Sequence, residues 1–116
     1  MTTDQPNRAG DAARDLAALP AVEIIGMYAA DLMTVAAIKC GLFEDAAGER
    51  DLADARILIT ALAGLVTAAA PELGSHHAAP LRDGLRSLQL AFREASPFPD
   101  EPGKGPGERL TGPVYG

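Results

Sequence analysis

Few residues in this chain have the types and spacing that site chemistry requires. His76 and His77 are adjacent, and neighbouring side chains on a helix point about 100° apart, so one metal ion does not easily take both. The single cysteine, Cys40, falls on the apolar face of a predicted helix, with no histidine–carboxylate pair at a recognisable spacing. We therefore predict no metal site, no cofactor and no catalytic residue. On this basis we predict that the protein is not an enzyme.

Two further patterns resemble functional motifs only superficially. Glu23 and Asp31 lie two helical turns apart, and we expect them to face solvent or to pair with Lys39 or a partner's arginine rather than to act as an acid and a base. The glycines around Lys104 (PGKGPGER) lack the Gly-Lys-Ser/Thr ending of a phosphate-binding loop, with no strand before and no helix expected after.

One constellation stands out, on a predicted third helix. A strip of polar side chains recurs at spacings of four, three and four residues: Arg82, Arg86, Gln89 and Arg93. Such a strip is usually a solvated helix face with internal ion pairs. The alternative is a docking strip for phosphates or for an acidic partner, which makes these four residues the candidate partner-binding site.

The helix that organises the chain is expected over residues 51–70, where apolar residues follow the helical period. Leu58, Leu62 and Val66 share one face, and Arg56 and Thr67 lie on the other. Asp51 is the expected N-cap, and Pro71 is expected to stop the helix.

Residues 20–42 form the most apolar segment, and they are apolar on two sides. One face holds Ile25, Ala29, Leu32, Met33, Ala36 and Cys40, and the other holds Ile24, Met27, Val35 and Ile38. A helix with two apolar faces needs two partners, so we predict a homodimer whose interface includes Ile25, Leu32, Met33 and Ala36. Glu23, Asp31 and Lys39 recur through the segment, which argues against a membrane span.

The remaining elements complete an all-α prediction. Gly41 is expected to end the second helix, residues 43–50 to form a charged loop, and residues 75–95 to form a third helix with a core stripe of Leu81, Leu85, Leu88 and Phe92. We predict a disordered N-terminus over residues 1–10, a helical domain over residues 11–95 that begins with a short helix, and a disordered Pro/Gly-rich tail over residues 96–116. The fold is an antiparallel helical hairpin, residues 20–42 against 52–70, plus a third helix.

The amino-acid composition argues against several functional classes. The net charge of −6 disfavours general binding to DNA and to anionic membranes. Aromatic residues make up 4% of the chain, so platforms for stacking bases are nearly absent. One cysteine excludes an internal disulfide framework and suits a reducing cytoplasm.

Three segments together resemble a known family: residues 19–42, the run DLADARILITALAGLVTAAAPELGSHHAAPLRDGLRSLQLAFREAS, and the ending GKGPGERLTGPVYG. They resemble the DUF1844 family of small bacterial proteins, in its actinobacterial branch. The resemblance implies a short, cytoplasmic, helical protein with no assigned activity. Genes of such proteins often lie near those for translation initiation factor three and two large-subunit ribosomal proteins, which makes a translation-linked role worth testing.

Three hypotheses for the function remain open. The first is a homodimeric, protein-binding adaptor. The second is a ribosome- or RNA-associated factor that uses Arg82, Arg86 and Arg93, with binding that weakens steeply with salt. The third is a carrier of a small apolar ligand in the helical interior.

Overall fold

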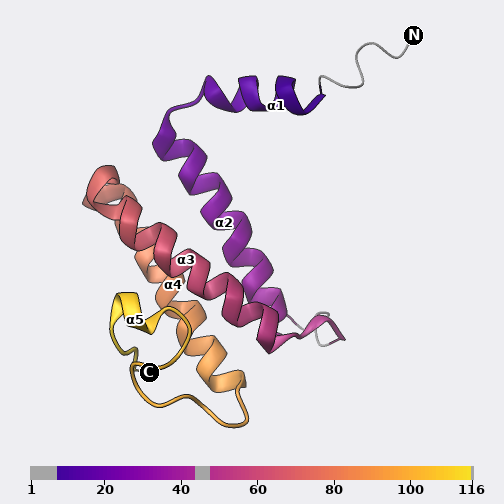
Figure 1. The fold of residues 1–116 in the computed structure, drawn as a ribbon, viewed down its shortest axis with the longest axis vertical. Helices are drawn as coiled ribbons and strands as arrows, with labels where there is room; N and C mark the ends of the chain where they lie inside the picture. The colour runs from indigo at the N-terminus through magenta and orange to yellow at the C-terminus, as the bar shows by residue number, and fades with distance from the viewer. Residues whose placement is uncertain (1–7, 44–47, 116) are drawn as a thin grey trace.

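The computed structural model describes residues 8–43 and 48–115, and throughout this part of the chain every regular element is a helix. These helices are α1 (Arg8–Ala17), α2 (Ala21–Lys39), α3 (Leu52–Leu73), α4 (Ser75–Ala95) and α5 (Glu108–Thr111). Helices α3 and α4 form a tight antiparallel hairpin, α2 crosses it obliquely, and α5 lies against α3 (Figure 1). The predicted all-α fold and the packing of α2 against α3 are confirmed.

The ends of α2 and α3 follow from local sequence. Asp51 accepts a hydrogen bond from the backbone N–H of Asp54 at 3.0 Å, which caps α3 as predicted. After α2, Gly41 takes a φ of +80°, and its N–H donates to the carbonyl of Ile38 while that of Leu42 donates to the carbonyl of Ala37. This is the Schellman arrangement, which turns the chain back toward α3.

Helix α3 does not stop at Pro71, as the sequence predicted, but runs on to Leu73. Proline removes one N–H donor, which would have served the carbonyl of Thr67. Both Pro71 and Thr67 are exposed, so water can take the place of that donor. The helix ends instead at Gly74, whose φ of +83° reverses the chain into α4. Ser75 is therefore the first residue of α4 and not its N-cap.

The core forms where small side chains let three helices approach closely. Ala29 and Ala36 on α2 and Ala55 and Ala63 on α3 are fully buried, with larger residues such as Ile59, Leu62 and Phe92 between them. The predicted core stripe of α4 packs inward, with Leu85, Leu88 and Phe92 buried. Gly84 marks the crossing of α2 over α4, because a Cβ there would lie 2.7 Å from Sδ of Met33.

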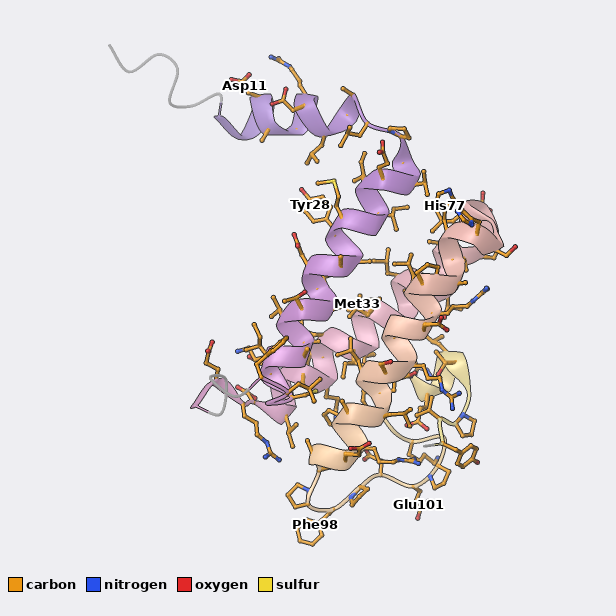
Figure 2. All side chains as sticks on the ribbon, turned by 180° about the vertical axis from the view of Figure 1, so that it is seen from behind. Asp11, Tyr28, Met33, His77, Phe98 and Glu101 are labelled. Atoms are coloured by element: carbon orange, nitrogen blue, oxygen red, sulfur yellow. The ribbon has the colours of Figure 1, made fainter. Side chains whose placement is uncertain are left out.

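The predicted dimer-interface residues lie on the face of α2 that packs within the chain. Ala36 is fully buried in the core, and Leu32 and Met33 pack against it. Figure 2 shows Met33 between α2 and α4. Ile25 is half-buried on the same side. Leu32, Met33 and Ala36 are thus engaged in intramolecular contacts, which leaves the other side of α2 more open to a second copy.

The prediction of a disordered tail is wrong for residues 96–115, which we call the C-terminal segment. The segment folds back along α4 toward α3 (Figure 1), contains α5 and buries Val114 and Glu108. Its prolines and glycines exclude a long regular element, but they do not exclude a fixed path when long-range contacts hold it.

At the other end, α1 leads away from the bundle (Figure 1) and makes few contacts with it. It begins at Arg8, so residues 8–10 are helical where the sequence predicted disorder, and it ends at Ala17. The rest of the predicted disordered N-terminus, residues 1–7, lies outside the described residues, as do residues 44–47 of the predicted loop.

Candidate functional site

The polar side of α4 and the C-terminal segment form one interface, and Gln89 is at its centre. Gln89 is 2% exposed. Its amide Nε2 donates to the carbonyl oxygen of Pro106 at 3.1 Å and to Oγ1 of Thr111 at 3.0 Å. A buried amide whose donors are both used fixes the position of its partners, because losing them would leave polar groups unsatisfied. Gln89 therefore anchors the segment at both ends of α5.

Two arginines of the predicted strip hold the end of the segment. Arg86 donates from Nη2 to the carbonyl oxygen of Tyr115 at 2.7 Å, and Arg93 donates from Nη1 to the carbonyl oxygen of Val114 at 3.0 Å. Guanidinium donors make the stronger, charge-assisted class of hydrogen bond. The strip thus binds backbone carbonyls of its own chain.

Glu108 is the counterpart of these arginines inside the segment. Its side chain is 3% exposed, and Oε1 lies 3.9 Å from Nη2 of Arg93. The same oxygen accepts from the backbone N–H of Gly103 at 3.0 Å and of Val114 at 3.3 Å. One buried carboxylate therefore joins the start of the Gly-rich loop, the last buried apolar residue and α4.

Close backbone approaches complete the interface. Gly107 has a φ of +75°, and a Cβ on it would lie 2.5 Å from Cβ of Ala63 on α3. Arg56 on α3 pairs with Asp100 at 2.8 Å and lies over the ring of Phe92, 5.0 Å from its centroid. The segment is thus held from α3 as well as from α4.

Arg82 differs from the other members of the predicted strip. Among the described residues its guanidinium has no hydrogen bond or ion pair, and it is exposed. Gln89, Arg86 and Arg93 contact the C-terminal segment. A phosphate or an acidic partner that used the whole strip would have to displace the segment, and binding to the ribosome, RNA or protein through these residues stays a prediction.

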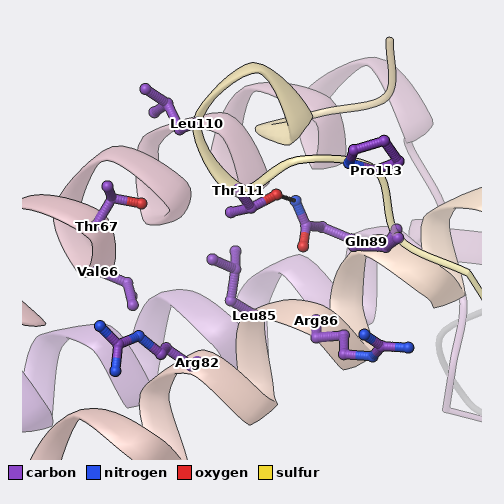
Figure 3. Close-up of a pocket in the computed structure, with 10 residues that line it drawn as sticks. Val66, Thr67, Arg82, Leu85, Arg86, Gln89, Leu110, Thr111 and Pro113 are labelled. Carbon is purple, nitrogen blue, oxygen red and sulfur yellow. Dashed lines mark hydrogen bonds between the residues drawn. The ribbon is translucent and has the colours of Figure 1, made fainter. Parts of the chain in front are cut away.

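A cavity of about 380 Å³ lies between α3, α4 and the C-terminal segment. Part of its lining is apolar, with Val66 and Leu85 from the helices and Leu110 and Val114 from the segment. Arg82, Arg86, Thr67 and Gln89 also line it (Figure 3). The site exists only because the segment is ordered, since the segment supplies one of the three walls.

A second hollow, of about 340 Å³, lies on the other side of Leu110. Lys104 and Arg109 line it together with Arg56 and the Gly-rich loop. Arg56 is neutralised by Asp100. This hollow is lined mainly by the loop, and no buried polar side chain lines it.

The residues first considered for chemistry are not assembled into a site. His76 and His77 are exposed at the α3–α4 turn, with ring centroids 5.2 Å apart. Glu23 and Asp31 are exposed, which agrees with the solvent-facing alternative, and Lys39 pairs with Asp54 at 3.2 Å instead of with either of them. Within residues 8–43 and 48–115, no three His, Cys, Asp or Glu side chains gather closely enough to hold a metal ion.

Cys40 is 3% exposed in the core beside Arg50. Burial raises the pKa of its thiol above the ordinary value of 9.0, and the nearby Arg50 charge opposes that rise. The thiol therefore stays protonated at neutral pH and acts as a small apolar side chain.

The far side of α2 is an exposed apolar surface, which we call the outer face: Ile24, Met27, Tyr28, Val35 and Ile38. Met27, Tyr28 and Val35 are 48%, 47% and 42% exposed. Figure 2 shows Tyr28 directed away from the hairpin. The sequence correctly separated two apolar faces of this helix, but it did not show which of them the rest of the chain covers.

Helices α2 and α3 are both long and apolar enough, by length and composition, to cross a membrane. Core helices of bundles meet the same two criteria. Here α2 and α3 pack on each other and on α4.

Sequence reasoning missed Glu108, Gly107 and Val114. The available signal was weak: a lone glutamate inside a Gly/Pro-rich stretch, followed by an apolar residue near the end. Their roles depend on contacts with residues of α3 and α4 that are distant in the chain.

The family model described as "Domain of unknown function (DUF1844)" matches residues 21–94. The match covers α2, α3 and nearly all of α4, which confirms the family resemblance seen in the sequence, and it ends before the C-terminal segment. No curated protein and no solved structure matches the chain.

Proposed function

The chain belongs to the DUF1844 family, and from its structure we propose that it is a non-enzymatic, homodimeric, protein-binding adaptor. The outer face of α2 is the proposed dimer interface, and its occupant is the same face of a second copy. The observation that carries this proposal is the exposure of Met27, Tyr28 and Val35 on a helix whose opposite side packs against the core of the chain.

The amount of exposed surface supports self-association. The chain exposes 7544 Å², whereas a compact monomer of this length is expected to expose about 6,000 Å². Its radius of gyration of 16.6 Å also exceeds the value of about 13 Å expected for a compact domain. Part of the excess belongs to α1. A second copy on the outer face would cover another part of it.

The spacing on the outer face fits a second helix. Ile24, Tyr28, Asp31, Val35 and Ile38 follow one another at intervals of four, three, four and three residues. This is the heptad spacing of helices that pack side by side. Asp31 is the one charged residue in this series and lies at the middle of the seam, where an antiparallel second copy would bring two carboxylates close together. A single polar residue in such a seam favours one register at a cost in stability.

The test is the molar mass of the full chain in solution, by light scattering after size exclusion or by sedimentation equilibrium. We expect a dimer for the natural chain and a folded monomer for Met27→Lys and for Val35→Lys. Both side chains are exposed in one chain, so these variants should keep the helical circular-dichroism signal.

Ile57→Lys is the matched control. Ile57 is an apolar residue on α3 that is 66% exposed and does not belong to the outer face of α2. It should leave the dimer intact. A natural chain that is monomeric at high micromolar concentration, or a dimer that survives both α2 variants, would rule out this interface.

In such a dimer, the protein that the adaptor binds would contact a surface that the second copy does not cover. The α4 side with its C-terminal segment is the candidate, because it lies on elements that the proposed interface does not use. Capture on a column with Met27→Lys as a second bait tests whether a partner requires the dimer or only the single chain.

A further inference from the structure

We propose that the cavity between α3, α4 and the C-terminal segment binds a small carboxylic acid with an apolar body. The cavity has a volume of about 380 Å³, which lies within the range of about 300–1,000 Å³ seen for small-molecule sites. Its lining combines apolar side chains with polar ones, which include Arg82, Arg86 and Gln89, and small-molecule sites likewise pair apolar surface with a few polar groups.

Two arginines at the cavity indicate that the ligand carries a negative charge. Arg82 has no hydrogen-bonding or ionic partner among the described residues, and Arg86 uses one Nη2 donor on the carbonyl of Tyr115. A guanidinium has five N–H donors in a planar fork, so both side chains retain donors. A carboxylate is the small anionic group that this fork matches in two-point geometry.

Gln89 supplies an independent indication that the cavity is a polar-group site. It is 2% exposed, and its side-chain Nε2 donates both hydrogen bonds that the amide makes to the described residues, one to Pro106 and one to Thr111. Figure 3 shows its amide oxygen directed away from Thr111, toward the part of the cavity beside Leu85. An acceptor at a cavity wall suits a ligand that carries a proton donor, such as a hydroxyl or a bound water.

The rest of the lining sets the shape of the ligand. Val66, Leu85 and Val114 are buried and form an apolar bottom, and Leu110 forms a side. A ligand with its carboxylate at Arg82 and its chain on these residues would remove apolar surface from water on both partners.

This inference does not depend on the proposed dimer, because none of the cavity residues belongs to α2. The ligand class follows from charge and shape alone. Fatty acids and aryl carboxylic acids share that chemistry.

The experiment is a nuclear magnetic resonance titration of the full, isotope-labelled chain with octanoate, octylamine and benzoate. The reporters are the side-chain amide of Gln89 and the backbone amide of Thr67. We expect saturable shifts of both signals with octanoate and none with octylamine, which has the same chain and the opposite charge. Benzoate separates aryl from alkyl acids.

Three variants make the test specific. Arg82→Gln removes one charge from an exposed residue and should weaken octanoate binding by about tenfold or more, the loss expected for one charge-assisted hydrogen bond. Thr67→Trp, also at an exposed position, should fill the cavity and abolish binding. Arg14→Gln, in α1, is the matched control and should bind as the natural chain does.

The proposal fails if neither acid shifts these signals in the millimolar range. It also fails if octylamine binds as well as octanoate, or if Arg82→Gln keeps the natural affinity. Each variant's amide spectrum reports whether the C-terminal segment stays docked, so loss of the cavity by unfolding is visible in the same measurement.

Discussion

Gln89 and Pro106 are joined by a hydrogen bond of 3.1 Å between two buried groups, the side-chain amide of α4 and a backbone carbonyl of the C-terminal segment. Neither group has water as an alternative partner in this position. The bond therefore helps to hold a Pro/Gly-rich stretch, which has little intrinsic structure, on one path along the bundle.

The first prediction concerns this bond. Gln89→Ala leaves the Pro106 carbonyl buried without its donor, which should lower the free energy of unfolding by about 1–3 kcal/mol. Backbone relaxation measurements should show residues 96–115 becoming mobile. Ser87→Ala, at an exposed position of the same helix, is the control. An unchanged stability and an immobile segment in Gln89→Ala would contradict the role assigned to Gln89.

The second prediction concerns the closest approach of the segment to α3. Gly107→Ala places a Cβ 2.5 Å from Cβ of Ala63 at a φ of +75°. The backbone conformation alone should cost about 1–2 kcal/mol, and the overlap should add about 1–3 kcal/mol.

Ala63→Gly separates these two costs. In the double variant the overlap disappears while the backbone cost remains, so a denaturant-unfolding cycle should show a favourable coupling between the two positions. Additive effects would mean that Gly107 is required for its backbone conformation only.

The third prediction follows from the thiol of Cys40. Burial raises its pKa in the folded state above the ordinary 9.0. At a pH between the ordinary pKa of the unfolded chain and the raised pKa of the folded chain, the unfolded chain has released the thiol proton and the folded chain keeps it. The free energy of unfolding therefore falls as the pH rises from the first pKa to the second. The stabilisation is complete below 9.0, and its slope is at most about 1.4 kcal/mol per pH unit.

Cys40→Ala should remove this part of the slope, which isolates it from tyrosine and lysine titrations that both proteins share. Urea unfolding at several pH values on either side of 9.0 measures the difference. Parallel pH profiles for the two proteins would show that the thiol titrates normally.

The fourth prediction uses Asp31, which lies in the heptad series that runs along the outer face. If a second copy covers this face, Asp31→Leu should tighten the dimer by about 1.5–3 kcal/mol per buried leucine. Asp83→Leu makes the same change at an exposed position of α4 and should leave the dissociation constant unchanged. Sedimentation at several concentrations compares them, and a weakened or unchanged Asp31→Leu dimer would place the interface elsewhere.

Local sequence was sufficient wherever a short-range pattern decides the structure. The period of the apolar residues correctly predicted α2, α3 and α4. Asp51 was correctly predicted to cap the start of α3, and Gly41 to end the helix before it. Leu85, Leu88 and Phe92 were correctly placed in the core. These outcomes depend on residues three or four positions apart, which the sequence shows directly.

Tertiary structure decided the rest. Residues 96–115 lack a periodic pattern, and their order depends on contacts with residues far away in the chain. Gln89 binds Pro106, which is 17 residues away, and Arg93 binds Val114, which is 21 residues away. Ala63 lies against Gly107. Likewise, the sequence showed two apolar faces on α2, but only the packed bundle determined that Ala36 faces inward and Val35 outward. The physical reason is the same in both cases. Whether a side chain is buried depends on the segments that pack against it, so the sequence of one segment does not determine its burial.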